Sequence, residues 1–458
     1  MKASKAAVSS QRAVRTSKRA DKSSPASTQC FMERLPSEVL TKILSYLDAS
    51  ALFSISHTNK LFYLLASDDI LWKKIYMSEF CKNKKQIPKF LDALKMESED
   101  HVTGYWKSQY FKTIATRDLK KWKRLLGPIS FHTGLPSQTE QVLRNLRVAW
   151  ELTVTSTSGH ESTLELSCSH FSETSVTLCW SAGCYLPNYE QISTLQLHGV
   201  RRITPNCPSL KKRSLMLRLD MHTLNKNAQT FGQDSLVQMK LLQPGVIVGV
   251  WRDQCSVAFI TFTLHIHRLV ERSSQGSSAC TYVEPIVKPP FDDTDPEYGL
   301  HGYQLHIVLH NTVCKVMSES FSQLFCRRAQ ISDGLVQFTA VNRTNLSQHI
   351  ALSGTISLPW QCEALQGTVE NCCIMSLTLL DEFRKPFRCA TSPVSMELDD
   401  TSVCYDYDGD QYMIHYQDSG IQVKMQLVQL KDQKQVILIS LVVFLSVGDV
   451  NKHFSRDY

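Results

Sequence analysis

Residues 35–40 read Leu-Pro-Ser-Glu-Val-Leu, and residues 43–48 continue with Ile-Leu-Ser-Tyr-Leu-Asp. Four apolar residues of this stretch recur at the spacing of one helical face: Leu40, Ile43, Leu44 and Leu47. Pro36 stands at an early helical position, where its missing N–H costs nothing. Asp48 can close this helix and cap the next one. The stretch therefore predicts an amphipathic helix at the start of a helical region.

The residues that follow predict two further helical segments. Residues 49–65 repeat the apolar period, and Ser67-Asp68-Asp69 offers caps for a third helix over residues 70–76. A helical region of about 45 residues leaves much of its apolar surface uncovered, because small units bury a smaller share of their surface on folding. We therefore expect this region to bind a partner. The alternative is a helical bundle that closes its own core.

Three short motifs give this region a family resemblance: Leu-Pro at its start, Tyr-Leu-Asp at the end of the first helix and Leu-Trp-Lys in the third. With them, residues 31–78 resemble an F-box. The resemblance implies that the region docks on the adaptor Skp1 inside a cullin-RING ubiquitin ligase of the SCF (Skp1–cullin–F-box) type, while the rest of the chain selects the substrate. Carried over by position, the residues of the docking surface or its immediate support are Leu35, Pro36, Leu40, Ile43, Leu44, Leu47, Leu71 and Trp72. Several of them must belong to the helical core, and the sequence alone does not separate the two groups.

The positive charge of the chain is concentrated in its first 30 residues. Of the total net charge of +7, this tail carries +6, from seven basic residues and one acidic residue. The remainder is close to neutral, which argues against a folded domain that binds nucleic acid. We expect a disordered tail, with weak nuclear targeting or anion binding as alternatives. The tail has no apolar run of a secretory signal. These features predict a cytoplasmic protein, with the nucleus as a second location.

The longest apolar run, residues 436–447, has twelve residues, against roughly 20 for a membrane-spanning helix. We expect a buried strand there and no membrane span. The fifteen cysteines of a chain without an export signal indicate a reducing compartment, so no disulfides are expected. For the same reason the sequons at Asn342 and Asn345 are not expected to carry glycans.

Residues 79–148 predict a helical linker. Residues 82–89 form a basic connector, and helical spacing returns over residues 104–126. The apolar positions of this second stretch lie between Lys and Arg residues: Trp106, Tyr110, Ile114, Leu119, Trp122 and Leu125. They predict an amphipathic helix whose apolar face packs in a core while its basic face meets solvent. The alternative is nucleic-acid binding, because a basic face with aromatic residues also occurs in nucleic-acid binders.

From Trp150 onward the sequence alternates and is rich in β-branched residues, which is typical of short strands. We expect strands at 150–155, 174–180, 215–219, 245–251, 258–264, 303–309, 350–358 and 374–380. Residues 412–416 and 421–428 flank Asp418-Ser419-Gly420 and predict a hairpin, and the Pro-rich, acidic stretch 284–297 predicts the longest loop. The fold class is therefore α+β, with an F-box and helical linker before a large antiparallel β-sandwich or barrel over residues 149–458.

The β-rich region lacks the repeats of common substrate receptors, because no period with Gly-His and Trp-Asp spacing, no leucine-rich period and no kelch period occurs. The chain is therefore similar to the F-box-only class. Four stretches of the β-rich region, together with Gly-Tyr-Trp-Lys at 104–107, resemble one member of that class. They are 245–251 (Gly-Val-Ile-Val-Gly-Val-Trp), 264–272 (Leu-His-Ile-His-Arg-Leu-Val-Glu-Arg), 295–306 (Asp-Pro-Glu-Tyr-Gly-Leu-His-Gly-Tyr-Gln-Leu-His) and 379–387 (Leu-Leu-Asp-Glu-Phe-Arg-Lys-Pro-Phe).

Metal-ligand patterns are incomplete. None of the fifteen histidines begins the His-x-Asp or His-x-Glu triplet of an iron oxygenase, and His160-Glu161 lacks a second histidine at position 164. Four histidines at strand spacing could share a face and hold an ion: His265, His267, His306 and His310. Strand histidines satisfied by hydrogen bonds or solvent are the more common case.

Two other patterns are weaker still. Cys179 and Cys184 form a C-x4-C pair without a second pair at zinc spacing. Residues 406–410 begin like a calcium loop, but the glycine comes one position early and position 417 is Gln, so we expect a turn.

Without a phosphate loop or a nucleophile elbow, these patterns predict a non-catalytic substrate receptor with no metal or cofactor. The sequence does not locate its substrate-binding surface. The alternative is a β-domain that binds a small ligand or catalyses a reaction, with the F-box serving to regulate the turnover of the protein itself.

Overall fold

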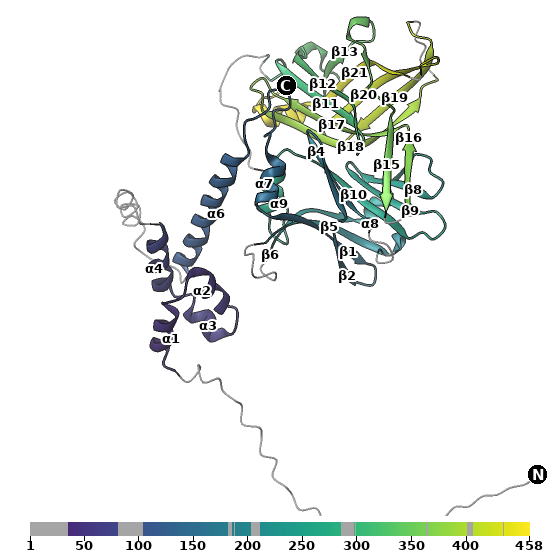
Figure 1. The fold of residues 1–458 in the computed structure, drawn as a ribbon. Coiled ribbons are helices and arrows are strands. Elements are labelled where there is room, and N and C mark those ends of the chain that lie inside the picture. The colour runs from purple at the N-terminus through teal and green to yellow at the C-terminus, as the bar shows by residue number, and fades with distance from the viewer. Residues whose placement is uncertain are drawn as a thin grey trace, which may run out of the picture. The chain divides into compact units, whose positions relative to one another are not determined.

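The computed structural model describes residues 35–80, 104–181, 186, 188–202, 211–284, 297, 299–362, 365–400, 406–433 and 435–458. The chain folds as two units that meet in sequence between Lys121 and Trp122 (Figure 1). The predicted tail 1–30, the basic connector 82–89 and nearly all of the predicted loop 284–297 lie outside the described residues.

The first unit consists of helices, some of which begin at side-chain caps. They are α1 (Ser37–Leu44), α2 (Ala49–Ile55), α3 (Lys60–Leu65), α4 (Asp69–Phe80) and the first part of α6 (Tyr105–Leu125). The Asp48 carboxylate accepts from the Ala51 N–H at 2.8 Å and so begins α2. The Asn59 side chain accepts from the Phe62 N–H at 2.8 Å and begins α3. This second cap divides the predicted segment 49–65 into two helices.

An aromatic core holds this unit together. Trp72 is fully buried, and its Nε1–H donates to the Ala66 carbonyl at 2.7 Å. The start of α6 is fixed to α4, because the Asp69 carboxylate accepts from the backbone N–H groups of Gly104 (3.1 Å) and Trp106 (2.9 Å). Trp106 and Tyr110 are buried in the core of the unit, as the helical spacing predicts.

The predicted apolar stripe on α6 is not buried along its whole length. Trp122 is buried, but Leu125 is 48% exposed. The prediction of a core position is therefore wrong for Leu125, although Trp122 in the same last turn is buried. The side chains of Ile114 and Leu119 are outside the described residues.

The second unit is built from antiparallel sheets. A four-stranded sheet has the order β2 (Glu161–Glu165), β1 (Val148–Ser156), β5 (Ile192–Arg202), β6 (Lys211–Asp220). A six-stranded sheet has the order β3 (Cys168–Phe171), β4 (Ser175–Trp180), β10 (Val257–His265), β9 (Val246–Trp251), β8 (Val237–Gln243), β7 (Gln229–Phe231). A separate hairpin pairs β15 (Ser357–Cys362) with β16 (Leu365–Glu370). The helices of this unit are α7 (Thr139–Asn145), α8 (Met221–Leu224), α9 (Leu269–Ser274) and α10 (Val447–Phe454).

The largest sheet curls into a half-barrel (Figure 1). Its strand order is β12 (Lys315–Leu324), β11 (Tyr303–His310), β17 (Cys372–Leu380), β18 (Pro386–Leu398), β19 (Gly409–Gln417), β20 (Ile421–Leu430), β21 (Val436–Ser446), β13 (Leu335–Val341), with β14 (Ile350–Ala351) also beside β21. The curl passes through β18, since residues 386–395 pair with β17 and only residues 396–398 pair with β19. The inward side chains form one large core that includes the fully buried Tyr303 and Phe338. The predicted α+β class with a large antiparallel domain is confirmed.

Most of the predicted strands lie within observed ones, with one clear exception. The alternation over 350–358 predicts one strand, but the structure has the short β14 and the start of β15, separated by a turn at Gly354 with φ +130°. The predicted hairpin is confirmed: β19 pairs with β20, and Asp418 Oδ1 accepts from the N–H groups of Gly420 (2.8 Å) and Ile421 (3.0 Å). Strand β21 covers the longest apolar run except its last residue, Val447, which begins α10.

None of the helices in the described parts of the chain is both long enough and apolar enough to cross a bilayer.

Candidate functional site

Helix α1 carries more apolar surface than its own unit covers. Leu40 and Leu44 are buried at 1% and 2% exposure, but Val39 and Ile43 on the adjoining side remain 45% and 43% exposed. At 3.6 residues per turn these two pairs form one continuous apolar arc. Tyr46 continues the exposed side just beyond the helix end. Half of the apolar arc of α1 is therefore available to a partner.

Further exposed apolar side chains lie on neighbouring elements of the same unit. Helix α3, which packs against α1, exposes Tyr63 and Leu64, and α4 exposes Ile70 in its first turn. Large exposed apolar side chains concentrated in a small unit are typical of a binding surface rather than of a solvated face. We name this set, Val39, Ile43, Tyr46, Tyr63, Leu64 and Ile70, the exposed apolar set.

The eight residues predicted from the sequence divide into two groups. Leu40, Leu44, Leu71 and Trp72 are buried in the core of the unit. Pro36 and Ile43 are exposed, and Leu35 and Leu47 are half-buried. The buried group can act only by supporting the helices, whereas the other four can take part in contact.

Sequence reasoning missed five members of the exposed apolar set: Val39, Tyr46, Tyr63, Leu64 and Ile70. A sequence signal for such residues is the width of the apolar arc. On α1 this arc is wider than one packed neighbour can cover, so part of it must remain exposed. Which half of that arc is covered depends on the path of the later helices, and the spacing of apolar residues does not contain that information.

The four strand histidines do not form one site. His265 is buried on β10, where its Nδ1 accepts from the His267 N–H (3.0 Å) and its Nε2–H donates to Thr378 Oγ1 (2.8 Å). His310 Nε2 lies 3.3 Å from Ser175 Oγ. Burial lowers the pKa of His265 to about 3 and also lowers the pKa of His310, so both rings are neutral at pH 7.

The other two histidines of the predicted quartet have partners of their own. His267 Nε2 lies 3.4 Å from Glu284 Oε1, and His306 Nδ1 lies 2.8 Å from Ser320 Oγ. Within the described residues, no group of three or more His, Cys, Asp or Glu side chains is arranged to hold a metal ion. His265 and His310 instead connect strands of the six-stranded sheet to strands of the half-barrel, whereas His306 bonds Ser320 within the half-barrel.

The remaining sequence patterns also have structural outcomes. Glu161 begins strand β2, so the His160-Glu161 pair is not on a helix. Gly409 begins β19 directly after Asp408, whose carboxylate accepts from Lys431 Nζ at 2.9 Å. Cys184 lies outside the described residues.

The β-unit contains a cavity of about 750 Å³ between the six-stranded sheet and the segment formed by β15, β16 and β17. Its aromatic wall is Phe259, which stacks on Trp360 with ring centroids 5.8 Å apart. Its polar wall includes Thr177 and Thr263, whose hydroxyls lie 3.3 Å apart. The size and the mixture of aromatic and hydroxyl groups are typical of a ligand site.

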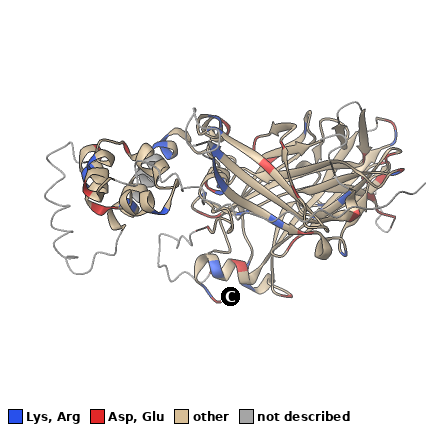
Figure 2. Cartoon of the chain, turned by 90° about the horizontal axis from the view of Figure 1, so that it is seen from below, with Lys and Arg blue, Asp and Glu red and all other residues tan. Residues whose placement is uncertain are grey.

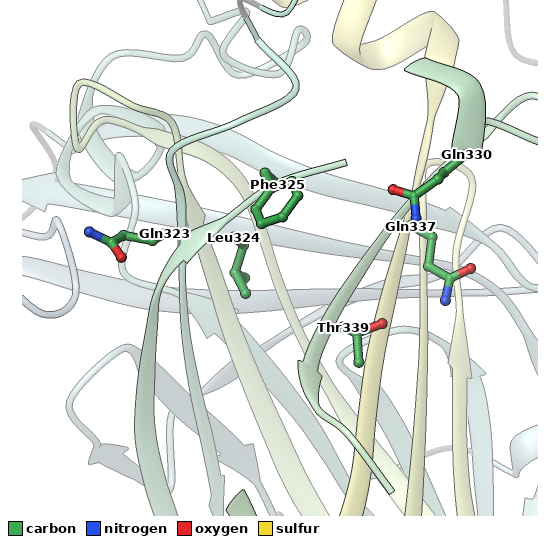
Figure 3. Close-up of a pocket in the computed structure, with 6 residues that line it drawn as sticks. All are labelled: Gln323, Leu324, Phe325, Gln330, Gln337 and Thr339. Atoms are coloured by element: carbon green, nitrogen blue, oxygen red, sulfur yellow. The ribbon is translucent and has the colours of Figure 1, made fainter. Parts of the chain in front are cut away.

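A smaller cavity of about 290 Å³ lies where the two edges of the half-barrel, β12 and β13, approach each other (Figure 3). Its lining consists of Gln323, Leu324, Phe325, Gln330, Gln337 and Thr339. Amide, hydroxyl and apolar groups line it, and none of these side chains titrates near pH 7. This cavity can bind a polar group but offers no acid or base for catalysis.

Basic residues gather where β5 pairs with β6, since the register sets Arg201 opposite Lys212, which lies between Lys211 and Arg213. Elsewhere on the β-unit, Figure 2 shows basic and acidic residues interspersed along the strands. Where basic residues of β6 lie near an acidic one they are paired, since Lys211 Nζ lies 2.9 Å from Glu151 Oε1 and Arg213 Nε lies 3.7 Å from Glu151 Oε2. This distribution agrees with the near-neutral charge of the sequence after its first 30 residues.

Comparison with known proteins gives a family match and relatives that span the chain. The F-box-like family profile matches residues 32–78. F-box only protein 15 of Macaca fascicularis is 33% identical over 437 residues, which covers 93% of this chain and 100% of that protein. F-box only protein 15 of Homo sapiens is 33% identical over 441 residues, covering 93% and 86%. F-box protein SKIP8 of Arabidopsis thaliana is 35% identical over 85 residues, covering 19% and 31%.

Proposed function

The chain belongs to the F-box only protein 15 family, and on that premise we propose that it is a substrate-recognition subunit of an SCF ubiquitin ligase. F-box proteins generally hold that position in SCF complexes. In this proposal the first unit binds Skp1, and through it the cullin and RING subunits. The β-unit binds a protein substrate that is then ubiquitinated and degraded.

The observation that carries the proposal is the exposed apolar set on α1, α3 and α4. Leaving Ile43, Leu64 and Ile70 in water is unfavourable by roughly 25 cal/mol for each Å² of apolar surface, and a helical partner would remove that cost. The buried group beneath, centred on Trp72, holds α1 and α4 in fixed positions, so the partner meets a preformed surface.

The proposed contribution of the chain to ubiquitination is proximity. A substrate held by the β-unit has its lysines near the thioester of the conjugating enzyme, which raises their effective concentration without any bond-making group on this chain. The proposal therefore assigns no catalytic residue, no metal and no cofactor. It places the protein in the cytoplasm, with the nucleus as a second location favoured by the basic residues of the tail.

A double substitution on α1 tests adaptor binding. Val39→Asp with Ile43→Asp places two charges in the proposed interface, while Leu40 and Leu44 stay in the core. We expect Skp1 to be lost from the full-length chain in co-purification, with Kd raised by more than tenfold, because burying an unpaired carboxylate is costly.

Glu38→Ala is the matched control for this experiment. Glu38 is exposed on the same helix, away from the apolar arc, and its loss should leave Skp1 recovery unchanged. Full Skp1 recovery by the double variant, with both proteins equally folded by circular dichroism, would contradict the proposed docking surface.

The 750 Å³ cavity favours a second function, in which the β-unit binds a small ligand or carries an enzymatic activity and the F-box regulates the turnover of the protein itself. Its titratable lining groups among the described residues are Cys168, His170 and Cys179. A thermal-shift screen against a metabolite library decides between the two readings. A ligand at a hundredfold excess over its Kd would stabilise the β-unit by about 2.7 kcal/mol, and Thr263→Leu should abolish that shift.

A further inference from the structure

Two cysteines on neighbouring strands face each other in the β-unit. Strands β3 and β4 pair antiparallel, and the register places Cys168 directly opposite Cys179. Opposite residues of antiparallel strands have Cα atoms about 4.5–5.5 Å apart. A disulfide bond joins Cα atoms about 4.4–6.8 Å apart. The register therefore places the two residues within the Cα range of a disulfide bond.

The two thiols differ in environment. Cys168 is exposed on the edge strand, whereas Cys179 is half-buried, and both line the 750 Å³ cavity. The Cys179 thiol donates a hydrogen bond to Cys168, which lowers the pKa of Cys168 to about 6. The same hydrogen bond, together with burial, raises the pKa of Cys179. Cys168 is thus an accessible thiolate at pH 7 with a protonated thiol beside it.

The buried cysteines of the half-barrel provide a contrast. Cys372 and Cys373 are fully buried on β17. Burial raises the pKa of Cys372 to about 12 and raises that of Cys373 further. These thiols stay protonated and inaccessible, so they behave as small apolar core residues.

We propose that Cys168 and Cys179 are a peroxide-sensitive dithiol that closes to a cross-strand disulfide at the wall of the cavity. The Cys168 thiolate attacks one oxygen of a peroxide such as hydrogen peroxide, the O–O bond breaks, and hydroxide leaves, giving a sulfenic acid. The Cys179 sulfur then attacks the Cys168 sulfur, its proton and the hydroxyl leave as water, and the S–S bond forms. In total two thiols lose two electrons, and one peroxide becomes two waters.

The bond would have a local structural effect. Strand β3 has four residues and is the edge strand of the six-stranded sheet. A disulfide at Cys168 would fix this short strand to β4 and so fix one wall of the cavity. The resting state is the dithiol, in agreement with the reducing compartment that the sequence indicates. The proposal does not depend on the proposed ligase function.

Cys362 on β15 is the competing partner. It is half-buried and lies close enough to Cys179 for their charges to interact. It belongs to a separate two-stranded hairpin, however, and does not share a strand register with either residue. The proposal therefore assigns the bond to Cys168 and Cys179.

Peptide mapping of the full-length chain tests this assignment. The reduced protein is treated with hydrogen peroxide, remaining thiols are blocked with N-ethylmaleimide, and the cross-linked peptides are identified by mass spectrometry. We expect an intramolecular Cys168–Cys179 disulfide that dithiothreitol reverses. Cys179→Ser keeps a hydrogen-bond donor beside Cys168 but cannot form the disulfide, so it should instead leave a sulfenic acid at Cys168 that reacts with dimedone. Cys314→Ser, which removes another exposed cysteine, should leave the disulfide unchanged. A bond from Cys179 to Cys362, or no intramolecular bond, would overturn the proposal.

The pH dependence of alkylation provides a test that needs no disulfide. At pH 6 half of the Cys168 side chains should be thiolate, against about 0.3% for a thiol with the ordinary pKa of about 8.5. Because nucleophilicity falls with pKa, we expect iodoacetamide to modify Cys168 about tenfold faster than a free cysteine peptide at pH 6. Cys179→Ala should remove this advantage. Equal rates at pH 6 for Cys168 and the free peptide would refute the thiolate assignment.

Discussion

Helix α1 leaves Val39 and Ile43 more than two-fifths exposed, whereas strand β11 of the larger unit buries all eight of its residues. Both elements carry several apolar residues among polar ones. The strand is covered on one face by the half-barrel core and on the other by polar contacts to the six-stranded sheet, such as Ser175 to His310. Among the described residues, the helix packs against α3 and leaves its other apolar side exposed. Apolar residues therefore define a core in one unit and half of an interface in the other.

Polar side chains also have different roles in the two units. Hydroxyl and imidazole groups join sheets inside the β-unit, where Thr174 Oγ1 donates to Ser376 Oγ at 2.7 Å and His265 Nε2–H donates to Thr378 at 2.8 Å. In the described part of the first unit, most side-chain hydrogen bonds join residues within four positions of each other, and those of Asp48 and Asn59 begin helices. Loss of a polar group should thus disturb sheet packing in the large unit and single helices in the small one.

The largest expected effect comes from the removal of a buried tryptophan in each unit. Trp72→Ala and Trp180→Ala each delete a fully buried side chain, at a cost of about 3–5 kcal/mol. The small unit has less stability to lose, so we expect Trp72→Ala to unfold it and to abolish Skp1 binding. Trp180→Ala should lower the melting temperature of the β-unit without unfolding it at 25 °C.

Hydrogen exchange followed by mass spectrometry resolves the two units in one experiment. Peptides from residues 37–80 should exchange rapidly in Trp72→Ala, while those from β10 and β17 stay protected. Equal protection of the helical peptides in both variants would contradict the claim that the small unit depends on this one side chain.

The next effect concerns binding rather than folding. Leu64→Asp on α3 should weaken Skp1 binding by about 30-fold, equivalent to about 2 kcal/mol, because it places a charge within the exposed apolar set. Leu346→Asp changes a similarly exposed leucine of the β-unit and should leave Skp1 affinity unchanged. Both variants should keep their unfolding free energy within about 0.5 kcal/mol. Isothermal calorimetry with purified Skp1 measures the difference, and equal affinities would remove α3 from the surface.

The sequence predicts where the helices and strands lie better than it predicts which of them pack together. Alternation identifies β9, β10 and β11, and apolar spacing identifies α1. It does not give the register that sets Cys168 opposite Cys179, because the alternation predicts β4 but not its short partner β3. It also does not give the fold that brings Trp360 onto Phe259, because that contact joins segments far apart in the chain and each segment alone is typical of an ordinary strand.

The candidate site shows the same limit. The sequence identifies the helices of the docking surface, but it assigns Leu40, Leu44, Leu71 and Trp72 to the surface or its support without separating the two roles. The burial of Leu44, Leu71 and Trp72 involves α6, which contributes Trp106 and Tyr110 to the same core and is held to α4 through Asp69. The intervening residues carry no pattern that predicts this return.

The third prediction concerns pH. Burial lowers the pKa of His265 to about 3 and also lowers those of His306 and His310. The unfolded chain takes up a proton at His265 below about pH 6.5, whereas the folded unit does so only near pH 3. Stability is therefore complete above pH 6.5 and falls as the pH is lowered toward 3, with about 2 kcal/mol lost at His265 between pH 6.5 and pH 5.

Urea unfolding of the β-unit at a series of pH values checks this effect. His265→Gln keeps a donor and an acceptor for Thr378 and the His267 N–H but does not titrate, so it should flatten the slope between pH 6.5 and pH 5. Unfolding of the first unit, which does not contain His265, serves as the internal reference. A wild-type stability that stays constant over this range would show that His265 is not held neutral.

The smallest effect is expected at a helix start of the first unit. Asn59 separates α2 from α3 by accepting from the Phe62 N–H, and Asn59→Ala should cost about 1 kcal/mol, because the N–H groups at the start of α3 lose their side-chain partner. Asn59→Asp keeps the acceptor and should cost less than half as much. Since α3 carries Tyr63 and Leu64, fraying of its first turn should also weaken Skp1 binding a few-fold, even though Asn59 is not itself an apolar contact. A binding loss in Asn59→Ala that Asn59→Asp restores would link the order of this short helix to the docking surface. An equal loss in both variants would instead assign Asn59 a direct contact with the partner.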